Sequence, residues 1–133
     1  MPIPFDPRKI YYRTPFGAVE QDTNIHFRIL VPRHLHTQKA ELCVKYDYDY
    51  NWMFTNLIWC GLFDDDTEIW ECDFATDRIG LYWYSFKLTT NDGMRYVVPS
   101  DAYNVSSIEH SPGRSWQITC YKKGFETPKW PVG

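Results

Sequence analysis

The residues best suited to bind a ligand lie in one short segment, in which aromatic and hydrogen-bonding side chains alternate. The segment 46–52 reads Tyr-Asp-Tyr-Asp-Tyr-Asn-Trp. A sugar ring has an apolar C–H face that stacks on an aromatic plane, and hydroxyls that need hydrogen-bonding partners. The segment therefore predicts carbohydrate binding, with Tyr48, Tyr50, Asn51 and Trp52 as contact residues. The alternative interpretation of the same residues is that the rings pack over a sheet edge.

A second aromatic candidate is Trp83, which lies in an alternating stretch. Tyr82 and Tyr84 point to one face of a strand there, so Trp83 points to the other and meets solvent, a ligand or another domain. Tyr103 is a further ring that could join a binding surface. Two other tryptophans alternate with expected core residues and are predicted to be structural: Trp70 and Trp116.

Catalytic chemistry is not predicted for this chain. It has no G-x-S-x-G, H-E-x-x-H, Gly-rich phosphate loop or Ser-x-x-Lys motif. Acidic residues are plentiful, but glycoside hydrolysis needs two that face each other across a cleft. A convex sheet structure offers them no place to converge, so no catalytic residue is assigned.

Metal and cofactor binding are not predicted either. His34 and His36 lie in a polar loop, and Asp64–Asp66 with Glu68 lack the spacing of a calcium loop. No C-x-x-C pair occurs, which disfavours a zinc or redox site. The cysteines lie in apolar or alternating segments and are predicted to be reduced core residues, with a disulfide as the alternative: Cys43, Cys60, Cys72 and Cys120.

Length and composition bound the remaining possibilities. The 133 residues suit one domain. Aromatic residues make up 18% of the chain, which is too many to serve only as the interior of that domain. A net charge of −3 leaves no basic surplus for nucleic acid or an anionic membrane. No apolar stretch approaches the roughly 20 residues that span a bilayer, and the amino terminus lacks a secretory signal pattern. We therefore expect a soluble chain.

Alternating polarity predicts a series of β-strands. Ile25, Phe27 and Ile29 lie on one face of a strand over 24–30, and a second strand covers 41–46. A third strand is predicted over 53–60, with less regular alternation. A fourth lies around 68–74, a hairpin turns at 91–93, and a last strand covers 115–121. The stretch 99–114 is predicted to be a loop.

These seven to eight short strands, without helical periodicity, predict an all-β protein. Their spacing is typical of an antiparallel, immunoglobulin-like β-sandwich. Four prolines before residue 16 favour an extended amino-terminal arm over 1–20. The sandwich itself is expected over 21–122, and an irregular tail over 123–133.

Three segments carry a resemblance to a known family. They are Tyr12–Val19, Leu81–Phe86, and Trp116–Tyr121 followed by Phe125–Trp130. In this order and spacing they are similar to the N-terminal domain of bacterial enzymes of the α-amylase superfamily, glycoside hydrolase family 13, of the neopullulanase, cyclomaltodextrinase and amylopullulanase kind. The resemblance covers nearly the whole chain. The end Trp130–Gly133 departs from the family pattern because it lacks Lys-Gly.

The resemblance implies an accessory domain whose tail, 123–133, leads to a catalytic (β/α)8 barrel. The parent enzyme would hydrolyse α-glucosidic bonds in starch, pullulan or maltodextrin, with its active-site carboxylates in the barrel and none here. The implied partners are an α-glucan and the barrel. The alternative is a structural domain that packs on the barrel or forms a homodimer without binding sugar. Whether the parent is cytoplasmic or secreted is left open.

Overall fold

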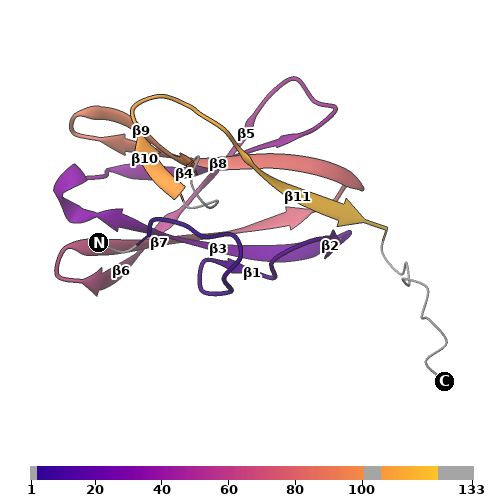
Figure 1. Ribbon diagram of the computed structural model, residues 1–133, viewed down its shortest axis with the longest axis horizontal. Helices are drawn as coiled ribbons and strands as arrows, with labels where there is room; N and C mark the ends of the chain where they lie inside the picture. Colours follow the sequence, from indigo (N-terminus) through magenta and orange to yellow (C-terminus); the bar gives the residue numbers. More distant parts are fainter. Residues whose placement is uncertain (1–2, 101–105, 123–133) are drawn as a thin grey trace.

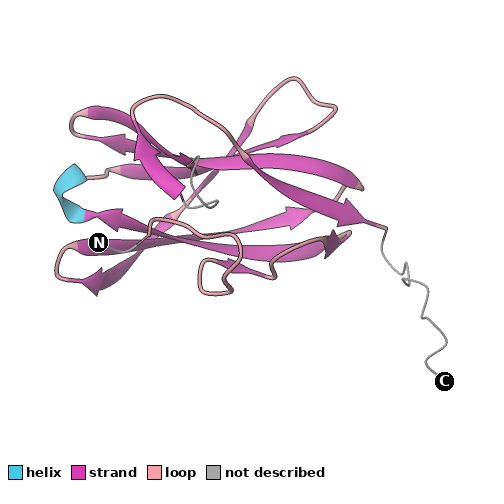
Figure 2. Cartoon of the chain, viewed as in Figure 1, coloured by secondary structure: helices cyan, strands magenta, loops and turns pink. Residues whose placement is uncertain are grey.

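The computed structural model describes residues 3–100 and 106–122, which form two β-sheets stacked as layers (Figure 1). The smaller sheet has the order β1-β3-β7-β6 and contains β1 (Arg13–Thr14), β3 (Thr23–Pro32), β6 (Ile58–Asp64) and β7 (Thr67–Thr76). The larger sheet contains β2 (Val19–Glu20), β4 (Lys39–Tyr46), β5 (Met53–Asn56), β8 (Gly80–Thr90), β9 (Gly93–Pro99), β10 (Ser106–Glu109) and β11 (Trp116–Tyr121). Figure 2 shows one helical turn, Arg33–Leu35, in the described part of the chain. The predicted all-β sandwich is confirmed.

Strand β8 is the centre of the larger sheet. It pairs with β4 along one edge and shares its other edge between two strands. Phe86–Thr90 pairs with β9, whereas Gly80–Tyr84 pairs with β11. The partner therefore changes at Ser85. Strand β2 joins the far side of β11 in a parallel pair, whereas the other strand pairs of the described residues are antiparallel.

The core between the sheets follows the predicted alternation. Ile25, Phe27 and Ile29 of β3 are fully buried, because every second side chain of a strand points to the same face. The inward residues of β8 face them from the other sheet: Tyr82, Tyr84, Phe86 and Leu88. Trp70 and Trp116 are buried, as predicted.

The segment predicted to be an extended arm contributes to this core. Phe5 is fully buried and packs on Phe86 and Trp116, with ring centroids 4.9 and 4.8 Å away. Its backbone N–H donates a 2.9 Å hydrogen bond to Ser106 Oγ. Tyr12 and Val19 are buried as well, and the short strands β1 and β2 lie in this segment.

The prediction of a single strand over 53–60 is wrong. Leu57 is buried, and its N–H donates a 2.8 Å hydrogen bond to the carbonyl of Ala40. This anchor interrupts the strand, so that β5 pairs with β4 in one sheet and β6 pairs with β7 in the other. The chain thus crosses between layers here, as strands do at sandwich corners. The predicted loop 99–114 also contains a strand, β10, which pairs with β9.

The prediction of core cysteines holds for Cys72 and Cys120, whereas Cys43 is buried on the outer face of the larger sheet. Cys43, Cys72 and Cys120 are buried free thiols, but Cys60 is exposed. Cys60 lies on β6, whose pairing with β7 shifts register after Trp59, so alternation no longer predicts which side chains are covered. The predicted tail 123–133, its Phe125–Trp130 motif and Tyr103 lie outside the described residues. In the described ranges, no helix is long and apolar enough to cross a membrane.

Candidate functional site

The predicted aromatic segment is a loop, 47–52, that connects β4 to β5 and is anchored by its two aspartates. The indole N–H of Trp83 donates a 2.9 Å hydrogen bond to Asp47 Oδ1. The guanidinium of Arg78 donates a 2.8 Å hydrogen bond to Asp49 Oδ2, in a charge-assisted pair. The structure therefore brings Trp83 to the base of the loop. One carboxylate oxygen of each aspartate holds the loop.

Contacts around Tyr46 complete this anchor. The guanidinium carbon of Arg78 lies 3.8 Å from the centre of the Tyr46 ring, and the Tyr46 hydroxyl donates to the carbonyl of Ile79. The ammonium of Lys45 donates a 2.8 Å hydrogen bond to the carbonyl of Asp49. The base of the loop is thus tied to the turn between β7 and β8.

The tip of the loop presents its rings to solvent. Tyr48 is 79% exposed and Tyr50 is 97% exposed, and Asn51 is exposed too. The Tyr48 ring leans on Tyr46, with centroids 5.8 Å apart and planes 47° apart. Large exposed rings that are held on a fixed base are typical of surfaces that bind a ligand or another protein.

Trp52 and Trp83 extend the aromatic surface along the outer face of the larger sheet. Lys45 pairs with Trp83, and Trp52 directly precedes β5 on the other side of β4. The backbone positions of the two tryptophans are thus about two strand spacings apart, about 10 Å. Trp52 is 39% exposed and Trp83 is half-buried. Since the indole N–H of Trp83 already donates to Asp47, Trp83 can contact a ligand through the face of its ring.

A groove beside Trp52 was not predicted from the sequence. It has a volume of about 270 Å³, and its lining includes Trp52, Phe54, Ser85, Tyr96 and Ser115. We call it the Ser85 groove. Period-two alternation from Trp52 and Trp83 could have placed Phe54 and Ser85 on the same outer face. The approach of β9 and of the residues before β11 depends on long-range pairing, which alternation does not reveal.

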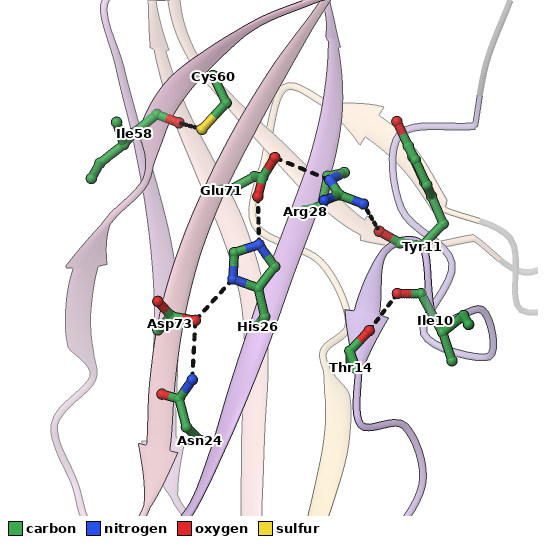
Figure 3. Close-up of polar contacts among 10 residues, drawn as sticks. All are labelled: Ile10, Tyr11, Thr14, Asn24, His26, Arg28, Ile58, Cys60, Glu71 and Asp73. Carbon is green, nitrogen blue, oxygen red and sulfur yellow. Dashed lines mark hydrogen bonds and ion pairs between the residues drawn. The ribbon is translucent and has the colours of Figure 1, made fainter.

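A cluster of charged side chains lies on the outer face of the smaller sheet (Figure 3). His26 of β3 bridges two carboxylates of β7, with Nδ1 2.8 Å from Asp73 and Nε2 2.5 Å from Glu71. Arg28 donates a 3.1 Å hydrogen bond to Glu71, and Asn24 donates one of 3.1 Å to Asp73. His26 and Arg28 alternate with the buried Ile25, Phe27 and Ile29 and therefore point outward. Their pairing with β7 follows from the β3–β7 register.

The pKa values in this cluster favour its charged form. Partial burial opposes the charge on His26, but hydrogen bonds to Asp73 and Glu71 outweigh it and raise the pKa of His26. Partial burial likewise opposes the charge on Glu71, but Arg28 and His26 together lower the pKa of Glu71. The hydrogen bond from His26 is the main cause that lowers the pKa of Asp73. The cluster ties β3 to β7.

Metal binding finds no support in the geometry of the described residues. In ranges 3–100 and 106–122, no group of three or more His, Cys, Asp or Glu side chains is placed to hold a metal ion. His34 and His36 line an open hollow of about 530 Å³ with Asp65 and Asp66. The Asp64–Asp66 segment leads through a turn from β6 into β7.

Comparison with known proteins gives one consistent relationship. No family model matches the chain. It is 27% identical over 133 residues to an amylopullulanase of Thermoanaerobacterium thermosulfurigenes, which covers 96% of this chain and 7% of that protein. It is 24% identical over 126 residues to an amylopullulanase of Thermoanaerobacter thermohydrosulfuricus, covering 92% of this chain and 8% of that protein.

The solved structures agree on the fold. A cyclomaltodextrinase superposes on 74% of this chain and 16% of its own, with a TM-score of 0.55 and 16% identity. The chain therefore spans only a small part of the length of the proteins it matches. The amylopullulanase matches confirm the resemblance that the sequence motifs predicted, and the cyclomaltodextrinase match supports the fold.

Proposed function

From this similarity to a segment of amylopullulanases, we propose that the chain is a non-catalytic accessory domain of a larger enzyme that hydrolyses α-glucans, and that it binds starch or maltodextrin chains. The match covers nearly all of this chain but less than a tenth of each amylopullulanase. That proportion is what an accessory domain of a large enzyme would give. Its role would be to raise the local concentration of the parent enzyme on the polymer.

The observation that supports sugar binding most is a fixed loop with exposed rings. Tyr48 and Tyr50 project from a base held by Trp83 and Arg78, so little ordering is needed before a sugar stacks on them. Asn51, Trp52 and Trp83 add an amide and two indoles. Because only a few rings and solvent-competed hydrogen bonds contribute, we expect a modest Kd of about 10–100 μM.

Isothermal titration of the purified chain with maltoheptaose and β-cyclodextrin tests this function. Saturable binding should be lost in Tyr50→Ala and Trp52→Ala variants whose circular dichroism matches the wild type. Phe63→Ala is the matched control, because this exposed ring lies on the smaller sheet. The absence of heat with millimolar sugar would contradict glucan binding by this chain.

A second candidate function is packing against the parent's catalytic barrel or a second copy. It is favoured by β6, an edge strand that exposes four large apolar side chains: Ile58, Trp59, Leu62 and Phe63. The ring of Tyr11 extends this surface, 6.3 Å from the Phe63 ring. Exposed apolar patches often mark interaction surfaces. Concentration-dependent dimerisation that Phe63→Ala abolishes, without sugar binding, would select the homodimer form of this role.

A further inference from the structure

The Ser85 groove combines rings and hydroxyls, unlike two larger hollows on the described surface. The hollow of about 530 Å³ is lined by charged and polar side chains, with no Phe, Tyr or Trp ring. A hollow of about 340 Å³ has no Phe, Tyr or Trp in its lining, and three of its polar residues, His26, Glu71 and Asp73, already bind one another. The Ser85 groove lies on the opposite outer face of the sandwich, over the larger sheet.

The strand register explains why the surface is hollow at Ser85. Phe54 of β5 pairs with Cys43 of β4, and Cys43 pairs with Ser85 of β8. A large side chain at the edge is thus followed by two small ones toward the centre of the sheet. Ser85 is also the point where the next strand changes from β11 to β9. The small side chains of Cys43 and Ser85, and the change of the neighbouring strand from β11 to β9, leave a space between larger side chains.

Aromatic rings stand on both sides of this space. Trp52 and Phe54 line it from the side of β5, and Tyr96 lines it from β9. Pro112 and Gly113, from the segment between β10 and β11 that is orange in Figure 1, close another side. The groove is thus bounded by surfaces on which the C–H faces of a sugar can pack.

The polar groups of the groove suit a neutral, hydroxyl-rich ligand. In the described part of the chain, no side-chain hydrogen bond engages the hydroxyls of Ser85, Ser115 and Tyr96. Lys87 adds an ammonium donor, 5.3 Å from the centre of the Phe54 ring. Burial raises the pKa of the Cys43 thiol to about 11, so the floor is uncharged at neutral pH. These groups can donate to and accept from sugar hydroxyls.

We propose that the Ser85 groove is a second glucose subsite, continuous through Trp52 with the loop 47–52. One α-glucan chain then lies on the loop rings and continues into the groove between Phe54 and Tyr96. This subsite rests on the proposed glucan binding, and it specifies the direction in which the bound glucan extends from the loop. It also makes Trp52 the ring that both parts of the surface share.

Titration with maltotriose and maltoheptaose tests the subsite, using a variant that fills the groove. Ser85→Phe places a ring on the floor, and Thr119→Phe is its matched control, because Thr119 is an exposed, outward residue of β11. Tyr96→Ala removes the far wall instead and remains informative if Ser85→Phe does not fold. Wild type should bind maltoheptaose more tightly than maltotriose. Ser85→Phe and Tyr96→Ala should each weaken maltoheptaose binding about tenfold, and Thr119→Phe should leave it unchanged.

The outcomes separate this subsite from the proposed function. If folded Ser85→Phe and Tyr96→Ala bind maltoheptaose as wild type does while Tyr50→Ala does not, the subsite is wrong and loop binding stands. If all folded variants bind equally, the site lies elsewhere and both assignments of residues are wrong. If the wild type binds neither sugar, the proposed function falls, and the subsite falls with it.

Discussion

The indole N–H of Trp83, on the central strand of the larger sheet, donates a 2.9 Å hydrogen bond to Oδ1 of Asp47, the first residue after β4. This bond connects β8, which pairs with three strands, to a loop whose tyrosines Tyr48 and Tyr50 are exposed. It gives the loop a defined starting position, while the backbone N–H of Asp47 donates to the carbonyl of Leu81 at 2.8 Å. A ring on a fixed base loses less conformational entropy on binding than one on a mobile loop.

Removing this anchor should weaken sugar binding without removing any contact ring. Asp47→Ala loses the acceptor for the Trp83 N–H, and a hydrogen bond of this kind contributes about 1 kcal/mol. We expect the Kd for maltoheptaose to rise about fivefold in titration calorimetry. Asp47→Asn keeps an oxygen acceptor and should bind nearly as wild type does. Equal affinities for Asp47→Ala and wild type would show that the anchor does not support binding.

Gly80, at the start of β8, should tolerate no side chain. Its φ is +130°, and an added Cβ would lie 2.6 Å from the Tyr46 hydroxyl oxygen. We expect Gly80→Ala to lower the free energy of unfolding by about 2–4 kcal/mol, through backbone strain together with overpacking. Chemical denaturation of the variant and the wild type measures the difference.

Gly61 provides the matched control for this prediction. Its φ is +104°, but an added Cβ would meet no atom within 4 Å. Gly61→Ala should therefore show the backbone strain alone and lose less stability than Gly80→Ala. Adding Tyr46→Phe to Gly80→Ala should recover part of the difference. Equal losses at the two glycines would mean that contact with Tyr46 contributes nothing.

The His26 cluster should make stability depend on pH. The pKa of His26 is raised above its ordinary 6.5, so its contribution is complete below that pH and is lost as pH rises through the folded-state value. The pKa values of Glu71 and Asp73 are lowered from 4.5 and 3.8, so their contributions are present above these values and are lost as pH falls further. The cluster should therefore stabilise most between about pH 4.5 and 6.5.

Thermal unfolding of His26→Ala beside the wild type measures this window. Arg28 keeps its hydrogen bond to Glu71 in the variant. Cys60 also lies close enough to Glu71 for the carboxylate to influence the pKa of its thiol. The stability difference should peak inside the window and stay within about 1 kcal/mol, because the side chains are partly exposed and screened. His34→Ala, at an exposed histidine, is the control. A difference that is constant from pH 4 to 9 would refute the linkage.

The alternation of polarity predicted the regular part of the fold because burial repeats every second residue there. It placed Phe27 and Tyr84 on the buried faces of their strands and Trp83 on the outer face, and the structure agrees. It failed at β6, where a shift of register breaks the repeat, and at Leu57, where the chain changes sheets. It also missed β10, whose pairing with β9 depends on tertiary contacts.

The loop residues of the candidate site could be predicted, because ring and polar side chains are adjacent in the sequence. The Ser85 groove could not, since Phe54, Ser85 and Ser115 come from three distant segments that only the sheet order unites. The same holds for the engagement of Asp47 and Asp49 by Trp83 and Arg78. Each of these two carboxylates uses one oxygen to hold the base of the loop.

The most direct test of glucan binding on this face is an amide and indole NMR titration of the ¹⁵N-labelled chain with maltoheptaose. The indole N–H signals of Trp52 and Trp83 should shift saturably, together with the backbone amides of Tyr48, Tyr50 and Asn51. The signal of Trp70, which is buried next to the smaller sheet's edge strand, should stay in place. No shift with millimolar sugar, or shifts confined to β6, would contradict a glucan-binding role for the loop and the outer face of the larger sheet.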